Sequence, residues 1–177
     1  MNAKVRLYVA TSLDGFVAGP DHGLDWLFTD GDYGFKAFYG AVGGLVMGRK
    51  TYDVVRGFGE WPYTDRPCWV FSRRPAVAHA GVRFVAGRPS DLIDEIAEEA
   101  GGPIWLVGGG EITAEFMVAG LVDELILSIH PIILGDGVRL FHRGIPRMDL
   151  ELVNSETWAS GLVQLTYARK DPAPVPA

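Results

Sequence analysis

The fold of this chain is decided by two segments: Leu45–Tyr52, with the sequence LVMGRKTY, and Pro103–Val118, with the sequence PIWLVGGGEITAEFMV. In each, a short apolar run typical of a buried strand meets glycine where a helix is expected to begin. A helix start offers unpaired N–H groups and the positive end of the helix dipole, and glycine lets a phosphate approach the backbone closely. Each junction alone is equally consistent with a tight turn between strand and helix. Together they favour a long anion held at two places, such as a dinucleotide.

Length and composition indicate one ordinary globular domain. The chain has 177 residues, of which 48% are hydrophobic and 21% charged, enough for a sizeable core. The net charge of -6 argues against general nucleic-acid binding. No apolar run is long enough to span a bilayer, and the first residues show no signal-peptide pattern, so we expect a cytoplasmic location and no membrane partner.

Further segments complete the expected architecture. Strands are expected at 5–11, 44–47, 67–72, 82–86 and 104–107, helices at 32–41, from 51, at 90–100 and at 111–118, and late strands within 121–133 and at 150–157 and 161–169, the last two forming a hairpin. Ser90 is a plausible N-cap and Gly101 a plausible stop for the third helix. This order predicts an α/β fold with three layers, in which helices flank a central mixed, mostly parallel sheet. Residues 1–171 would form this domain, with 172–177 as a disordered tail and 12–31 as a long irregular loop.

Basic side chains follow two of the expected strands at the same relative position. Arg49 and Lys50 come directly after one strand, and Arg73 and Arg74 follow Ser72 after the next. If these strands are neighbours, four cations converge on one edge of a nucleotide site, and a guanidinium matches the 2′-phosphate that distinguishes NADP from NAD. The alternative is solvated loop charge.

Several familiar site motifs are missing. Gly108-Gly109-Gly110-Glu111-Ile112-Thr113 lacks the third small residue of the usual NAD fingerprint, which disfavours a standard Rossmann dehydrogenase. The single cysteine, Cys68, lies in an apolar run, where a buried, inert thiol is expected. The four histidines show no spacing typical of metal ligands, so no metal site is predicted.

Among the acidic residues of the long loop, Asp32 stands out. It opens the expected helix that carries Phe35, and it follows Trp26 by six residues. A carboxylate beside aromatic rings can hold a flat, nitrogen-rich heterocycle, with the acid pairing to ring N–H groups. The alternative is an N-cap aspartate, which the spacing alone favours. Asp30 is the nearest competitor for the same role.

With these residues in view, the chain resembles the dihydrofolate reductase superfamily, especially bacterial dihydrofolate-reductase-like proteins related to the C-terminal reductase domain of the riboflavin-biosynthesis deaminase/reductase. The resemblance covers about residues 4–170. It rests on the order and spacing of five segments: Val9–Gly15, Val46–Tyr52, Phe71–Pro75, Leu106–Gly110 and Pro131–Gly137.

The resemblance implies NADPH as hydride donor. By position, Gly48, Arg49, Lys50 and Thr51, with Ser72, Arg73 and Arg74, would hold the adenosine and phosphate end of the cofactor. Gly108, Gly109 and Gly110 would lie under the pyrophosphate and nicotinamide, and Ala10 beside the nicotinamide. Asp32 stands sixteen residues before Gly48, the spacing of the family's substrate-binding carboxylate, which favours a catalytic role for it. Trp26 and Phe35 match the aromatic substrate-pocket positions with the spacing off by one.

The pattern departs from the family within the loop between Gly15 and Asp32, so the cofactor is better supported than the substrate. The first hypothesis is an NADPH-dependent reductase of a small heterocyclic, pterin- or pyrimidine-like substrate, expected to be a homodimer. The second is a non-catalytic NADP(H) or small-ligand binding protein that retains the fold. The third is an interaction role, in which the late strands Leu125–Ile133 and Leu162–Tyr167 pair across a homodimer.

Overall fold

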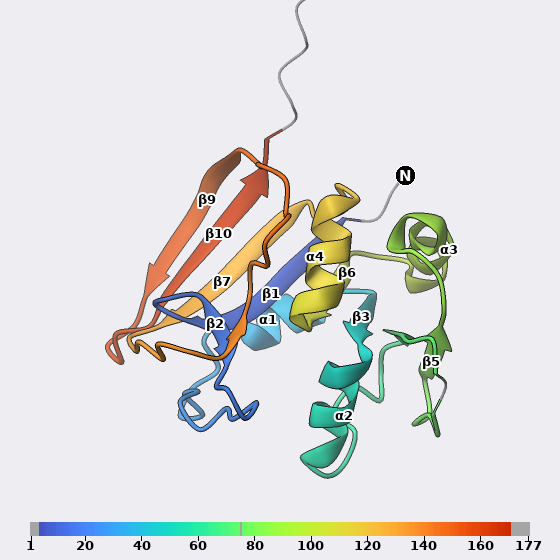
Figure 1. Ribbon diagram of the computed structural model, residues 1–177, viewed down its shortest axis with the longest axis horizontal. Coiled ribbons are helices and arrows are strands. Elements are labelled where there is room, and N and C mark those ends of the chain that lie inside the picture. Colours follow the sequence, from blue (N-terminus) through green and yellow to red (C-terminus); the bar gives the residue numbers. More distant parts are fainter. Residues whose placement is uncertain (1–3, 75, 171–177) are drawn as a thin grey trace, which may run out of the picture.

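One eight-stranded sheet, in the order β5-β4-β3-β6-β1-β7-β10-β9, forms the centre of the molecule (Figure 1). The computed structural model describes residues 4–74 and 76–170. Its strands are β1 (Val5–Ser12), β2 (Phe16–Ala18), β3 (Gly44–Gly48), β4 (Cys68–Phe71), β5 (Val82–Val85), β6 (Ile104–Gly108), β7 (Glu124–His130), β8 (Val138–Arg139), β9 (Leu150–Thr157) and β10 (Val163–Arg169). Its helices are α1 (Phe35–Gly40), α2 (Arg49–Gly57), α3 (Pro89–Ala100) and α4 (Gly110–Val118).

The sheet is mixed and mostly parallel, as predicted. All pairings from β5 to β7 are parallel, and only β7 with β10 and β10 with β9 are antiparallel. Because the carboxyl ends of parallel strands meet at one edge, the segments that follow β3, β4 and β6 are brought together there.

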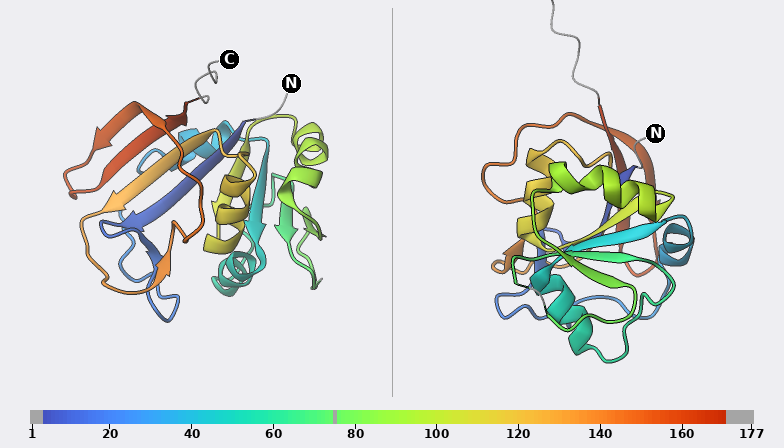
Figure 2. Two further views of the ribbon diagram at one scale, coloured as in Figure 1. Left: turned by 45° about the horizontal axis from the view of Figure 1, so that its top comes forward. Right: turned by 90° about the vertical axis from the view of Figure 1, so that its right-hand side faces the viewer.

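Helices cover both faces of the sheet, which explains the unbroken apolar runs of its central strands. Val46 packs in the core formed with α3 and α4, whereas its neighbours Leu45 and Met47 pack in the core formed with α1 and α2. In Figure 2 α1 lies on the opposite face of the sheet from α3 and α4. Cys68 belongs to the second core, where burial raises the pKa of its thiol to about 12, in accord with the expected inert role.

Local backbone chemistry accounts for the differences from the predicted elements. α1 begins at Phe35 rather than near Asp32, because Tyr33 (φ 48°) and Gly34 (φ 80°) are left-handed. Ser90 is not an N-cap: Pro89 occupies the first helical position of α3 and Arg88 precedes it as the cap. Gly101, at φ 63°, ends that helix as predicted.

The expected loop 12–31 contains a short strand, β2, which pairs with β8 to form a second, two-stranded sheet. Residues 172–177, predicted as a tail, lie outside the described residues. No helix in the described part of the chain is long and apolar enough to cross a membrane.

The late strands β7 and β10 pair with other strands of the same chain, so neither has a free edge for a second copy. β7 lies between β1 and β10, and β10 lies between β7 and β9, so both edges of each are occupied. The third hypothesis is therefore wrong in the strands that it chose. The edge strands of the sheet are β5 and β9, and the homodimer stays a prediction.

A glycine at the start of β3 makes a sharp test of how tightly the sheet and α3 are packed. An added Cβ at Gly43 would lie 2.3 Å from the Ala100 carbonyl oxygen and 2.8 Å from the Gly102 nitrogen, both backbone atoms. We expect Gly43→Ala to lower the free energy of unfolding by about 2–3 kcal/mol, measured by urea denaturation. Gly40→Ala is the matched control, because an added Cβ there meets nothing within 4 Å. Equal stability of the two variants would contradict this packing argument.

Candidate functional site

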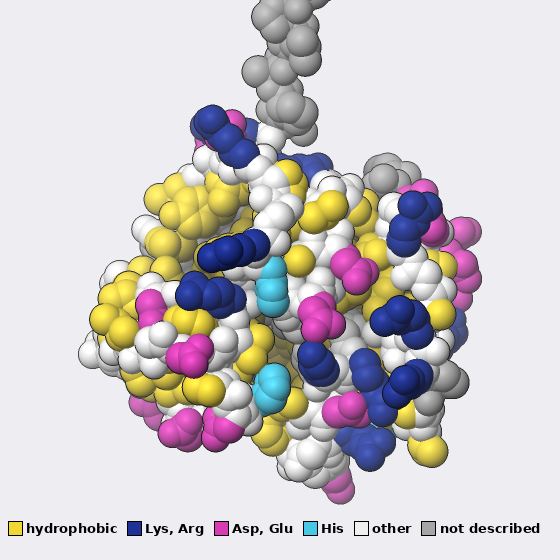
Figure 3. All heavy atoms as spheres, in the orientation of Figure 1, with side chains coloured by type: hydrophobic (Ala, Val, Ile, Leu, Met, Phe, Trp, Pro, Cys, Tyr) yellow, Lys and Arg dark blue, Asp and Glu magenta, His cyan; other side chains and the backbone are white. Residues whose placement is uncertain are grey.

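A long groove of about 1920 Å³ runs along the carboxyl ends of the parallel strands. Every residue predicted to hold the cofactor lines it: Ala10, Gly48, Arg49, Lys50, Thr51, Ser72, Arg73, Arg74, Gly108, Gly109 and Gly110. They meet because β3 pairs with both β4 and β6, and β6 pairs with β1. The prediction that four cations converge required the strands before them to be neighbours. β3 and β4 are neighbours in the sheet. In Figure 3 Lys and Arg side chains gather at the lower right, around α2 and β5.

The two glycine junctions meet at the floor of this groove. An added Cβ at Gly109 (φ 96°) would lie 2.8 Å from Thr51 Oγ1 and 3.9 Å from Gly48 Cα, so the starts of α2 and α4 lie side by side. The Oγ1 atom of Thr113, in the first turn of α4, is buried without a hydrogen-bond partner among the described residues. The floor therefore presents bare backbone, two helix starts and a buried hydroxyl, a set that suits an anionic ligand.

The groove's cations are held by partners that a ligand can replace. Lys50 Nζ lies 2.9 Å from Glu111 Oε1 with both side chains largely exposed (73% and 76%), so this ion pair is weak. It also lowers the pKa of Glu111. Arg49 pairs with Asp53 and donates to the Arg74 carbonyl at 3.1 Å, which links the segments after β3 and β4. Arg73 is exposed on the same segment.

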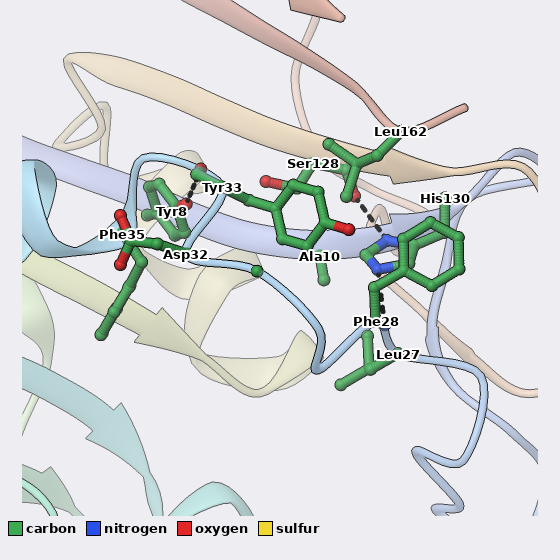
Figure 4. Close-up of a pocket in the computed structure, with 11 residues that line it drawn as sticks. Tyr8, Ala10, Leu27, Phe28, Asp32, Tyr33, Phe35, Ser128, His130 and Leu162 are labelled. Atoms are coloured by element: carbon green, nitrogen blue, oxygen red, sulfur yellow. Dashed lines mark hydrogen bonds between the residues drawn. The ribbon is translucent and has the colours of Figure 1, made fainter. Parts of the chain in front are cut away.

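A second hollow, a pocket of about 270 Å³, joins the groove at Tyr8, Ala10, Leu27 and Phe35. Figure 4 shows the Asp32 carboxylate beside Tyr8 and Phe35 at one end, and His130 with Phe28 at the other. The remaining lining residues are Gly31, Tyr33, Ser128 and Leu162. Since aromatic and aliphatic side chains make up most of this lining, the pocket suits a small flat ring.

One wall of the pocket, formed by Ala10 and Ser128, belongs to a row of residues that continues to Gln164 across three strands. Ala10 on β1 stands beside Ser128 on β7, which stands beside Gln164 on β10. Gln164 Nε2 lies 2.9 Å from Ser128 Oγ, 3.1 Å from the Tyr8 hydroxyl oxygen and 3.3 Å from the Tyr33 carbonyl oxygen, and its two N–H groups are shared among these three acceptors. Burial is the main cause that raises the pKa of Tyr8, so its hydroxyl stays protonated and donates to the Tyr33 carbonyl at 3.2 Å. This network fixes the left-handed Tyr33 against the sheet.

His130 holds the same loop at Phe28, five residues before Tyr33. Its Nδ1 lies 3.2 Å from the Ser128 carbonyl oxygen, and its Nε2 accepts the Phe28 N–H at 3.2 Å. Only a neutral ring with the proton on Nδ1 satisfies both contacts. Burial lowers the pKa of His130 below its ordinary 6.5, which agrees with a neutral ring.

This geometry predicts that acid weakens the contact between His130 and Phe28 and so lowers the stability of the fold. A His130 pKa below 6.5 in the folded state means that the unfolded chain binds more protons between the two values, so stability falls as the pH drops through that window. His130→Gln keeps an acceptor for Phe28 without titrating. We expect the wild-type midpoint of thermal unfolding to fall more steeply than that of the variant from about pH 7 to about pH 5. If the unfolding midpoints of the two proteins changed with pH in the same way, the proposed role of His130 would be wrong.

The predicted substrate-side residues are only partly brought together. Phe35 lines both hollows and Asp32 lines the pocket, whereas Asp30 lies outside it and accepts the Tyr33 hydroxyl at 2.7 Å. Asp32 is not the N-cap of α1, which is Gly34, but its carboxylate accepts the Lys36 N–H at 3.1 Å from two residues before that cap. Trp26 lines neither hollow and packs edge-on against His130, with the next residue, Leu27, in the pocket instead. The Trp26 ring lies instead against the His130 ring, with 5.1 Å between the ring centroids.

Eight of the residues that line the pocket are absent from the sequence-based prediction, and three of them, Tyr8, Ser128 and His130, lie on strands of the sheet. A signal existed for each: Tyr8 is two positions from Ala10 and shares its face of β1, and Ser128 and His130 are the polar residues, two apart, of an apolar strand. Which face of β7 adjoins Ala10 depends on its pairing with β1, which the sequence alone does not show.

A turn beyond β1 is tied to a segment far along the chain. Asp14 accepts hydrogen bonds from the Ser12 hydroxyl (2.7 Å), the Leu134 N–H (3.1 Å) and the Gly135 N–H (2.8 Å), and the first of these is the main cause of its lowered pKa.

Among the described residues no group of three or more His, Cys, Asp or Glu side chains could hold a metal ion.

A comparison with protein families agrees with the observed fold. Residues 3–164 match the RibD C-terminal domain family, nearly the whole chain. The chain belongs to this family. As a RibD C-terminal domain protein it is 34% identical to the uncharacterised protein YwjB of Bacillus subtilis strain 168, over 96% of this chain and 99% of YwjB.

Two solved structures place this RibD-type domain among known folds. A Shewanella sp. PV-4 protein, assigned provisionally to riboflavin biosynthesis, is 33% identical with a TM-score of 0.86, over 95% of this chain and 99% of that chain. The diaminohydroxyphosphoribosylaminopyrimidine deaminase/5-amino-6-(5-phosphoribosylamino)uracil reductase of Thermotoga maritima is 14% identical with a TM-score of 0.74, over 96% of this chain and 57% of that chain. The second likeness shows the shared fold alone. The predicted dihydrofolate-reductase-like α/β fold is confirmed.

Proposed function

We propose that this protein is an NADPH-dependent reductase that transfers hydride to a small heterocyclic, pterin- or pyrimidine-like ring. One observation carries the proposal: a cation-lined groove floored by two glycine–helix junctions opens at Ala10 into a small aromatic pocket with a carboxylate. A dinucleotide needs the first hollow and a flat ring needs the second, and the junction is where the two would react.

The groove fits the cofactor by its donor set. The starts of α2 and α4 would hold the pyrophosphate, with Thr51 and the glycines at close range. Arg73, Arg74, Arg49 and Lys50 would hold the 2′-phosphate end, Lys50 exchanging its weak pair with Glu111 for the cofactor. Membership of a family of reductase domains that typically use NADPH supports this choice. NADPH in this groove would supply the hydride.

The pocket's own residues supply the remaining functions. Asp32 would accept ring N–H groups and deliver, directly or through water, the proton that completes reduction. Ala10 leaves room for ring-on-ring approach at the junction, and the aromatic walls exclude water. The loop from Gly19 to Tyr33, held by His130 and by the Gln164 network, would keep the ring in place.

The proposal is tested by titrating the protein with NADPH and, in parallel, with NADH, while following tryptophan fluorescence. Trp105 lines the groove and reports occupancy directly. Binding with a clear preference for NADPH, followed by NADPH oxidation with a reducible pterin or pyrimidine, is the expected result. Failure to bind either nucleotide would remove the reductase proposal.

A non-catalytic NADP(H)-binding protein is the second candidate. The observation in its favour is the hydrogen bond from the Lys36 N–H to Asp32, because helix capping alone accounts for that carboxylate. NADPH binding without turnover of any pterin or pyrimidine would support this candidate over the first.

A further inference from the structure

The positive charge around the two joined hollows is unevenly divided. Five Lys or Arg side chains line the groove, namely Arg49, Lys50, Arg73, Arg74 and Arg88. None of the residues that line the pocket is Lys or Arg. The nearest cation in sequence to the pocket's carboxylate is Lys36, which is exposed on α1 and bonds to Asp32 through its backbone N–H only.

The pocket's titratable groups leave it negative. Asp32 contributes one carboxylate, and its neighbours Tyr8 and Tyr33 have pKa values raised above the ordinary value, so both stay neutral. His130 is neutral in the contacts that it makes with Phe28 and Ser128. A phosphate or carboxylate group placed here would face Asp32 without a compensating cation, which is unfavourable in a largely apolar hollow.

We propose that the substrate of this pocket is a flat heterocycle, neutral or cationic, that carries no phosphate or other anionic tail. This inference rests on the proposed reductase function and narrows its substrate class. It separates this chain from the Thermotoga enzyme, whose name includes a phosphoribosyl substrate. The groove's cations lie in the half assigned to the nucleotide, so they serve the cofactor and leave no site for a second phosphate.

The test compares two forms of one ring compound. We would measure binding of 5-amino-6-(5-phosphoribosylamino)uracil and of the same compound after phosphate removal, to protein saturated with NADP+ and to protein alone. The phosphate-free form is expected to bind at least about tenfold more tightly, because the phosphate would lie beside the Asp32 carboxylate in a pocket that no Lys or Arg lines. Tighter binding of the phosphorylated form would overturn the proposal, and so would absence of binding by both forms.

A variant reverses the expected preference. Gly31 is exposed, lines the pocket and has no positive φ, and the three atoms nearest to an added Cβ there all belong to the Tyr33 ring, the closest at 3.1 Å. Gly31→Arg should shift the preference toward the phosphorylated form by about tenfold or more, and Gly31→Gln, similar in length but uncharged, should not. Equal shifts in the two variants would contradict the role of charge.

These outcomes are separable from those of the proposed function. NADPH titration is performed first on each protein. Loss of nucleotide binding would contradict the reductase proposal, while the comparison of the two ring compounds without nucleotide would still decide the charge preference of the pocket. Normal nucleotide binding with a preference for the phosphorylated compound would overturn this inference alone.

Discussion

Asp32→Asn is expected to lower kcat by about 10²–10⁴-fold, the usual worth of a positioned acid or base, while NADPH affinity stays unchanged. The carboxylate lines the pocket beside Tyr8 and Phe35 and does not line the groove, so its effect should be confined to the ring and the proton. Asparagine keeps an oxygen that can accept the Lys36 N–H, so the helix start is preserved. Steady-state kinetics and a parallel NADPH titration measure the two effects separately.

Asp30→Asn is the matched control. Asp30 is exposed, accepts the Tyr33 hydroxyl and lies outside the pocket, and asparagine can accept that bond as well. Turnover should therefore be unchanged. If Asp32→Asn lowered turnover and NADPH affinity equally, or if Asp30→Asn were the more damaging variant, the catalytic assignment of Asp32 would be wrong.

The double variant Arg73→Ser/Arg74→Ser is expected to weaken NADPH binding by about 10- to 100-fold and to leave NADH binding almost unchanged. Charge-assisted hydrogen bonds to a phosphate contribute about 1.5–3 kcal/mol, and only NADPH carries the 2′-phosphate. The contacts of Arg74 with Arg49 and Ser72 run through its own backbone atoms, so serine does not remove them. Dissociation constants for both nucleotides, measured at one salt concentration, decide the result.

A second double variant separates a local contact from a change in overall charge. Arg143→Ser/Arg147→Ser removes the same charge from exposed positions that do not line the groove, so NADPH affinity should hold. If both double variants weakened NADPH and NADH alike, the arginines after β4 would act only through the general field of the protein.

The parts of the fold that could be predicted are those that depend only on the pattern of neighbouring residues in the sequence. Leu45–Met47 and Ile104–Val107 are apolar at every position and run into glycine, and the structure has β3 and β6 ending in the starts of α2 and α4. The late hairpin also follows from two strand patterns around a short turn, as β9 and β10 show. These features need no knowledge of distant segments.

Other parts could not be predicted because they depend on pairing or on competition between backbone signals. β2 and β8, with three and two residues, are too short for any periodicity and exist through their mutual pairing. Ser90 is a good cap by residue type, yet Pro89 begins the helix one residue earlier. Ser128 and His130 become pocket residues only because β7 lies against β1.

The hydrogen bonds of Gln164 determine at which stage of synthesis the pocket can be completed. Gln164 stands 156 residues after Tyr8 and 131 after Tyr33, the residues that it holds. During synthesis β1 is therefore made long before β10, whose Gln164 completes the hydrogen bonds behind the pocket wall. Nascent chains that end before β10 would lack this wall, and long-range closure of this kind slows folding. The ring pocket therefore gains this hydrogen-bonded support only after Gln164 has been synthesised, whereas the residues that line the groove all precede residue 143.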